Sequence, residues 1–168
     1  MTDDPPPTWG PWGPPVRVRI DHGPVWTFSR AVKDRSPIYA SAVAASAAGF
    51  ERVPAPPTYT FVMSSFGTWP DLQPAGGKGR LSEASIEDIA NRPGLSLHGE
   101  QAFVYHRQPL VGDILEGRLR TSEPWRKEGK RVMEVRLLET RWSDLDGQPV
   151  VTETTTAIYL PTAEELIE

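Results

Sequence analysis

The stretch that decides the fold runs from residue 28 to residue 50 and reads "FSRAVKDRSPIYASAVAASAAGF". It places a carboxylate, Asp34, five residues before the phenol of Tyr39. Between them, Ser36 is suited to cap a helix, and Pro37 is suited to its first turn, where a missing N–H costs nothing. We therefore predict that a helix begins at Ser36, directly beside a carboxylate.

The body of this predicted helix, residues 38–48, consists almost wholly of alanine and serine, and Gly49 offers a C-terminal stop. Small side chains bury little apolar area, so a helix of this kind is poorly anchored at a surface. The same small side chains let neighbouring elements approach the helix backbone closely. The composition therefore predicts a central helix around which a sheet is wrapped.

The remaining elements follow from periodicity and from turn residues. Alternating apolar and charged residues predict a strand over 16–20, and after a turn at 21–24 a short second element is expected at 25–28. A loop over 67–81 and a short helix over 82–94 fill the middle of the chain. Further strands are expected at residues 58–66, 96–107, 113–123, 130–142 and 149–160. An antiparallel meander packed on one helix is an α+β fold.

The 168 residues suit a single domain, which we place at residues 16–161 between two flanking segments. The segment 1–15 is dominated by proline, glycine and tryptophan and predicts no regular element. It is either an irregular, polyproline-like arm or an arm whose Trp9 and Trp12 pack on a partner subunit. The segment 162–168 is an acidic tail.

The composition excludes several classes of function. The chain has no cysteine, so disulfides, thiolate nucleophiles and zinc-thiolate sites are excluded, and a cytoplasmic location is expected. Its three histidines lack the spacing of metal ligands, and no basic run with interleaved aromatic residues favours nucleic acid. No apolar run is long enough to cross a membrane, and the acidic, proline-rich start is unlike a signal peptide.

Three segments in order resemble one known family: residues 28–50, "PAPPTYTF" at 54–61, and "LHGEQAFVYHRQPLVGDILEGRL" at 97–119. They are similar to the MaoC-like (R)-specific enoyl-CoA hydratases and 3-hydroxyacyl dehydratases, in particular to their N-terminal, FAS1-like dehydratase domain. The likeness covers residues 16–160. It implies a hot-dog fold, in which an antiparallel sheet wraps the central helix.

The resemblance also implies site residues. Asp34 falls on the family's catalytic aspartate, Ser36 on its helix-capping asparagine, and Pro37 matches its proline. Tyr39 falls on the catalytic histidine, and Lys33 falls where active subunits have glycine. A phenol with a pKa of about 10 is a poor base at neutral pH. In this family the domain with tyrosine at this position is commonly the non-catalytic half.

We accordingly name Asp34 as the one catalytic candidate, degenerate because its partner is a tyrosine. No metal site is expected. The expected substrate-binding residues are Tyr39, Ser36, Ala55, Pro56, Pro57 and Arg107. Each has a structural alternative: Asp34 stabilises a helix start, Ala55 to Pro57 set the start of a strand, and Arg107 forms a surface salt bridge in place of a phosphate contact. For His98 and His106, hydrogen-bonded structural roles are the default.

The leading functional hypothesis is a non-catalytic, substrate-shaping subunit of a heteromeric hydratase or dehydratase, inactive alone. Its partner is a MaoC-like hot-dog subunit with an intact Asp/His pair, in a dimer or a dimer of dimers. No cofactor is expected beyond the acyl-CoA or acyl-carrier-protein thioester that serves as substrate. The alternatives are a self-sufficient homodimer, acting as a hydratase or as a thioesterase through Asp34, and a non-catalytic acyl-thioester binding protein.

Overall fold

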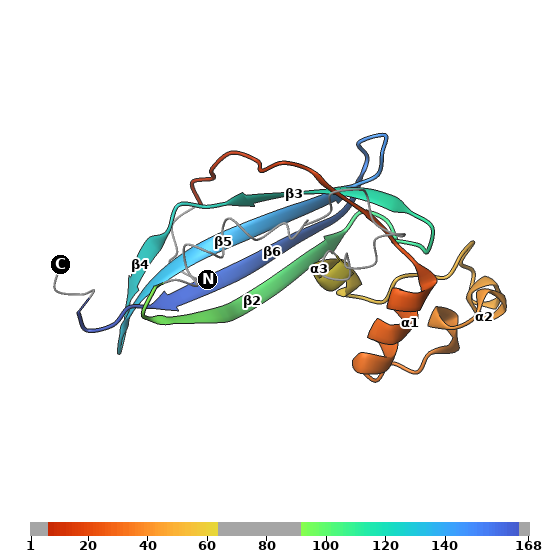
Figure 1. Cartoon of the computed structure of the whole chain (residues 1–168), viewed down its shortest axis with the longest axis horizontal. Coiled ribbons are helices and arrows are strands. Elements are labelled where there is room, and N and C mark those ends of the chain that lie inside the picture. The colour runs from red at the N-terminus through yellow and green to blue at the C-terminus, as the bar shows by residue number, and fades with distance from the viewer. Residues whose placement is uncertain (1–6, 64–91, 165–168) are drawn as a thin grey trace.

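The computed structural model describes residues 7–63 and 92–164, and it consists of one antiparallel sheet with a helical region at one end (Figure 1). The strands are β1 (Val16–Arg19), β2 (Leu95–Tyr105), β3 (Ile114–Thr121), β4 (Trp125–Glu128), β5 (Val132–Ser143) and β6 (Pro149–Leu160). The helices are α1 (His22–Ala31), the 3-10 turn η1 (Pro37–Tyr39), α2 (Ala42–Ala47) and α3 (Tyr59–Met63). No helix within the described residues is long and apolar enough to cross a membrane.

The strands are arranged in the order β1-β3-β5-β6-β2, with β4 paired to β5. Every pairing is antiparallel, which confirms the α+β class. The predicted meander is correct only for β3, β5 and β6. β2 and β3 follow each other in the sequence, but β2 pairs with β6 on the far side of the sheet. Sequence order alone cannot reveal this crossover, because each strand has the same alternation.

The β5–β6 hairpin forms as the sequence predicts. Its turn is closed by Asp144, whose carboxylate accepts hydrogen bonds from the backbone N–H of Asp146 at 3.1 Å and of Gln148 at 2.8 Å. Gly147 has φ +79°, a left-handed conformation that glycine adopts without strain. The turn therefore fixes the register that places Trp142 opposite Val151.

The helical region differs from the prediction in three places. The first is α1, which replaces the expected turn and short element. Asp21 is its N-cap residue, and Pro24 lies in its first turn, where backbone N–H groups have no partner inside the helix. Val25 donates its backbone N–H to the Asp21 carbonyl at 3.2 Å, which is the first i to i−4 hydrogen bond of the helix.

The second difference is the small-residue helix, which is not the element that the sheet wraps. The stretch splits into η1 and α2, and Ser41, not Ser36, caps α2 by accepting the N–H of Ala44 at 3.3 Å. α2 is mostly exposed at the end of the molecule, and its Val43 is 80% exposed. Only Tyr39 and Ala45 of this stretch are fully part of the core, because the other side chains offer too little apolar area.

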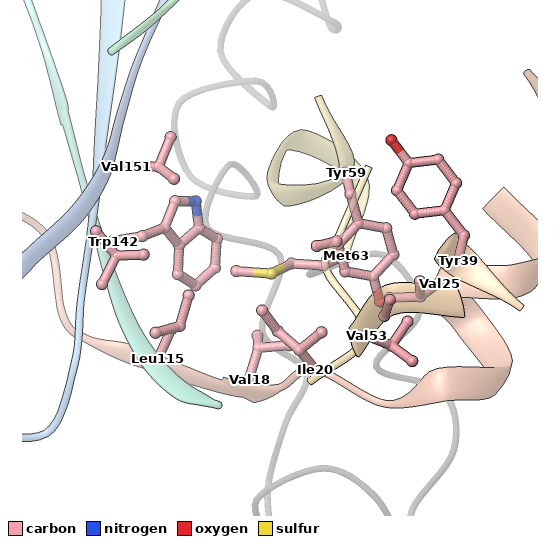
Figure 2. Close-up of a cluster of buried hydrophobic side chains, with 13 residues drawn as sticks. Val18, Ile20, Val25, Tyr39, Val53, Tyr59, Met63, Leu115, Trp142 and Val151 are labelled. Carbon is pink, nitrogen blue, oxygen red and sulfur yellow. The ribbon is translucent and has the colours of Figure 1, made fainter. Parts of the chain in front are cut away.

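The third difference is the predicted strand 58–66, of which residues 59–63 form α3 instead. Tyr59, Thr60 and Met63 are its buried residues, a helical spacing rather than an alternating one. Figure 2 shows the Met63 side chain extending from α3 toward Trp142 of the sheet. Thr58, just before α3, has φ +66°, a strained conformation for a β-branched residue. Residues 64–91, which include the predicted loop 67–81 and most of the predicted helix 82–94, lie outside the described residues, and residues 92–94 are not helical.

The N-terminal segment lies along the sheet. Gly10 donates its N–H to the Thr121 carbonyl at 2.9 Å, and Gly13 donates to Leu119 at 2.7 Å. The guanidinium group of Arg120 lies over both indole rings, 4.3 Å from the ring centre of Trp9 and 4.6 Å from that of Trp12. Within residues 7–15 the arm is therefore attached to its own chain, although its separation from a domain at 16–161 stays a prediction.

Gly117 of β3 lies against Trp142, and this contact gives a test of the core. A Cβ at Gly117 would lie 2.5 Å from the Trp142 ring, so we expect Gly117→Ala to lower the free energy of unfolding by about 1–3 kcal/mol. The matched control is Gly129→Ala, whose Cβ would meet nothing closer than 4.0 Å and whose effect should stay within about 0.5 kcal/mol. Urea unfolding of both variants measures the difference, and equal values would contradict the role of this contact.

Candidate functional site

The loop that carries Asp34 is set by the way α1 ends. Lys33 donates its N–H to the Arg30 carbonyl at 3.1 Å, and Asp34 donates to the Ser29 carbonyl at 2.8 Å. This pair of bonds is a Schellman motif, which needs a left-handed residue at its centre. Lys33 has φ +62° and occupies that position. The backbone thus explains why glycine suits it, since a residue with a side chain costs about 1 kcal/mol more there.

Asp34 is held by a local hydrogen bond and is half-buried. Its carboxylate accepts the backbone N–H of Ser36 at 2.9 Å, which forms a short turn before Pro37. The hydroxyl of Ser36 makes no capping hydrogen bond, although Ser36 is at the N-cap position of η1. The predicted helix cap by the Ser36 side chain is therefore absent. Instead, the carboxylate of Asp34 accepts the backbone N–H that precedes Pro37.

Tyr39 follows this turn as the last residue of η1, and it is 7% exposed. Figure 2 shows its ring at the edge of the buried cluster that also contains Val25, Val53 and Tyr59. Burial, and secondarily the charge of Asp34, raise the pKa of Tyr39 above its ordinary value. The carboxylate of Asp34 is therefore near enough for its charge to act on the phenol of Tyr39. The phenol stays protonated at neutral pH, so it can donate a hydrogen bond but cannot act as a base.

The segment before α3 is fastened to the turn between β2 and β3. Ala55 donates its N–H to the Pro109 carbonyl at 2.8 Å and accepts the side-chain amide of Gln108 at 2.8 Å. Pro56 is buried and Pro57 is exposed. These three residues lead into a helix and not into a strand, which corrects their expected structural role. Contact with a substrate stays a prediction for all three.

Arg107 is engaged in an ion cluster beneath this segment. Its guanidinium contacts the Asp113 carboxylate at 2.6 Å, and Arg52 contacts the other oxygen at 2.9 Å. Burial would raise the pKa of Asp113, but hydrogen bonds from Arg107, from the N–H of Leu110 and from Arg52 outweigh it, and the pKa is lowered. The arrangement supports the structural alternative for Arg107, because a phosphate would compete with a buried carboxylate.

The three histidines are dispersed among structural roles. His98 on β2 is exposed and lies edge-on to Phe61, with ring centres 5.6 Å apart. His106 contacts the Thr152 hydroxyl at 3.0 Å, and His22 contacts the Tyr39 carbonyl at 3.0 Å. Among the residues that the structure describes, no three acidic or histidine side chains form a group that could hold a metal ion.

The sequence interpretation missed Glu153, a buried carboxyl group on β6. Its side chain is 4% exposed and accepts the indole N–H of Trp142 at 3.0 Å. Burial raises the pKa of Glu153 to about 7, more than its polar neighbours Thr60 and Trp142 lower it. The signal was present, because Glu153 stands two residues after the core residue Val151 in an alternating strand and so faces inward.

The sequence of the chain matches the FAS1-like dehydratase domain region over residues 8–153. The chain belongs to this family. A UPF0336 protein from Saccharopolyspora erythraea is 31% identical to it over 144 residues, which are 82% of this chain and 79% of the relative. The FAS1-like dehydratase domain family therefore accounts for most of the sequence.

Two solved structures from Mycobacterium tuberculosis resemble this FAS1-like dehydratase domain. The C-terminally truncated HadBC (3R-hydroxyacyl-ACP dehydratase) complex gives a TM-score of 0.67 at 19% identity, covering 92% of this chain and 98% of the other. The ChsH1–ChsH2 complex gives 0.68 at 21% identity, covering 91% and 90%. These likenesses confirm the hot-dog fold and, with the family match, the expected membership among hydratase and dehydratase hot-dog proteins.

Glu153 gives a pH-dependent test of stability. The folded chain retains the proton up to about pH 7, while the unfolded chain releases it near 4.5, so stability falls as pH rises between these values. Glu153→Gln should therefore be more stable than the unchanged chain by about 2–3 kcal/mol at pH 8 and close to it at pH 4.5.

Urea unfolding at both pH values, with the exposed Glu100→Gln as control, measures this effect. A Glu153→Gln variant that is no more stable than the control at pH 8 would show that the buried carboxyl group costs nothing.

Proposed function

We propose that this chain is the non-catalytic, substrate-shaping subunit of a heteromeric (R)-specific 2-enoyl-thioester hydratase or 3-hydroxyacyl-thioester dehydratase. The observation that carries the proposal is Tyr39. It is a buried, protonated phenol beside Asp34, at the position where the resemblance to MaoC-like hydratases implies a histidine base. Loss of a general base lowers a rate by about two to four powers of ten. A chain with this site needs a partner that supplies the base.

The reaction adds water across, or removes it from, the C2–C3 bond of the acyl thioester. The partner's aspartate and histidine hold the water and move its proton. In this chain, the phenol of Tyr39 and the turn at Asp34 shape the wall of the site. The acyl thioester itself, carried by CoA or by a carrier protein, is the only group required, with no cofactor. The expected cytoplasmic location stays a prediction.

The surface of β2 supports a hot-dog partner. Among the described residues β2 is the last strand of the sheet, and no strand in 7–63 or 92–164 pairs with the outer edge of its 11 residues. Large apolar side chains on it and on the neighbouring α3 are 42–56% exposed, namely Leu95, Leu97, Val104, Tyr105 and Phe61. An open edge with exposed apolar residues favours association with another chain. Both neighbours named above, HadBC and ChsH1–ChsH2, are complexes, which agrees with this arrangement.

The two alternative functions make different use of the Asp34 carboxylate. A self-sufficient hydratase or thioesterase needs Asp34 to activate water without a histidine beside it. An acyl-thioester binding protein needs neither residue for chemistry. Both alternatives predict function without a partner, so activity with and without a partner separates them from the proposal.

The first expected outcome concerns turnover. The purified chain alone should not hydrate crotonyl-CoA or a long-chain 2-enoyl-CoA above the background rate. Activity should appear when it is combined with a MaoC-like subunit that carries the intact Asp/His pair, and should change less than about threefold in Asp34→Asn. The measurement is loss of enoyl-thioester absorbance for each combination.

Turnover by the chain alone that falls at least 100-fold in Asp34→Asn would replace the proposal with the self-sufficient enzyme. Tight binding of enoyl-CoA by the chain alone, with no activity in any combination, would replace it with the binding protein.

The second expected outcome concerns the partner surface. Val104→Lys places a charge on the exposed face of β2 and should weaken association with the catalytic subunit at least tenfold. Leu145→Lys is the matched control, because Leu145 is 57% exposed, against 56% for Val104, but lies in the β5–β6 turn. Analytical ultracentrifugation of the mixed subunits measures both, and equal association of the two variants would exclude β2 as the interface.

A further inference from the structure

Two arginines lie directly opposite each other on the face of the sheet that points away from the core. Arg118 of β3 is the register partner of Arg141 of β5. Their sequence neighbours Gly117 and Trp142 face the core, so both arginines project from the other face of the sheet. Like charges at directly opposed positions destabilise a sheet. An anion near both guanidinium groups would remove this repulsion.

Arg118 shares its carboxylate with a second arginine. Its guanidinium contacts Glu116 at 3.3 Å, and the other oxygen of Glu116 contacts Arg17 at 3.2 Å. The side chain of Arg118 is 49% exposed, and an exposed ion pair contributes little to stability, so an anion from solution can compete for it. Among the described residues Arg118 stacks on no aromatic ring, so it plays no part in holding the N-terminal arm.

Arg141 shares a carboxylate in the same way. Arg141 and Arg120 contact the same oxygen of Glu139, each at 3.0 Å. The guanidinium of Arg141 also lies 4.9 Å from the ring centre of Trp12, which holds it in place while its side chain stays 54% exposed. Together with the Glu116 pairs, four guanidinium groups face two carboxylates. This cluster therefore retains two positive charges.

A cleft of about 320 Å³ opens over the two opposed arginines, which is within the size range of small-molecule sites. Trp12 and Leu145 give it apolar walls, and the Ser143 hydroxyl is placed to donate a hydrogen bond. Asp144 and Glu116 also line it. The Asp144 carboxylate is engaged by two backbone N–H groups of its own turn and lies 3.9 Å from the guanidinium of an arginine outside the cleft. The cleft thus joins apolar walls to an excess of positive charge.

We propose that this cleft binds a phosphorylated small molecule with a planar organic part, such as a nucleoside monophosphate. The phosphate lies between the guanidinium groups of Arg118 and Arg141. The planar part packs against Trp12 and Leu145. A phosphate monoester carries about −1.5 to −2 charges at pH 7, which matches the cluster better than a single carboxylate does. Guanidinium groups also match phosphate oxygens with two parallel hydrogen bonds.

The inference does not depend on the proposed function. Trp142 belongs to the same core cluster as Tyr39, and Arg141, its neighbour in the sequence, projects from the other face of the sheet. A ligand in the cleft would therefore leave the face with Tyr39 uncovered. The site is one for a second ligand and not for the acyl thioester.

The experiment titrates AMP, GMP, CMP and UMP into the purified chain by calorimetry at low salt. We expect at least one nucleotide to bind about tenfold or more tightly than either its nucleoside or inorganic phosphate. Arg118→Gln should weaken nucleotide binding at least about tenfold. Arg118→Lys, which keeps the charge but not the planar fork, should weaken it about fivefold. Leu145→Ser should weaken nucleotide binding about threefold and leave phosphate binding unchanged.

The matched control is Arg126→Gln, which removes the same charge from an exposed position on β4. Figure 1 shows β4 at the opposite end of the sheet from the β5–β6 turn. This variant should change nucleotide binding less than about twofold. Equal loss in Arg118→Gln and Arg126→Gln, or no binding of any of the four nucleotides, would overturn the site. A nucleoside that binds as tightly as its nucleotide would overturn the placement of a phosphate between the two arginines.

Discussion

The buried indole of Trp142 joins the sheet to the helical end of the molecule. One side of the ring lies against Gly117 of β3, its N–H is accepted by Glu153 of β6, and Met63 of α3 reaches it from the helices. α3 contributes few residues to the described structure, so this contact determines where the segment ending in α3 meets the sheet. The positions of Ala55 and of the loop at Tyr39 follow, because both belong to the same core.

The hydrogen bond to Trp142 requires Glu153 to bury its carboxyl group. An indole N–H inside a core needs an acceptor, and a carboxylate is a strong one. Its burial, however, disfavours the charged form and raises the pKa of Glu153 to about 7. The core of the sheet therefore contains a polar link that is neutral in mild acid and charged in mild base, at the point where the sheet meets α3.

The long strands could be predicted because their residues alternate and their turns carry clear signals, as at Asp144 and Gly147. The order of β2 could not, because register with β6 depends on tertiary packing. The helices were misassigned for a related reason. Apolar residues in "TYTFVM" suit a strand by composition, but Tyr59 and Met63 meet the core only in a helix. The alanine-rich segment was expected at the centre of the sheet because its small side chains allow close approach, whereas the same side chains offer too little apolar area to bury it.

The roles of Asp34 and Tyr39 stay predictions that rest on their spacing and on the family resemblance. The structure adds the left-handed backbone at Lys33. For Arg107 the sequence left a phosphate contact and a salt bridge open, because its partner Asp113 is identified only once the turn after β2 is folded. Sequence alone cannot distinguish an arginine that pairs with a carboxylate from one that does not.

The two ends of the sheet are unequal, and this bears on how many chains can assemble. At one end, β1 has only four residues, its Arg17 and Arg19 are exposed, and the arm beside β3 contains Pro11, Pro14 and Pro15, which have no N–H to donate. At the other end, β2 has 11 residues and pairs with β6 alone among the strands that the structure describes. Growth by strand addition can therefore proceed from one end alone. Two such sheets joined at β2 would expose only their short, charged ends, so we expect a closed pair instead of a fibre.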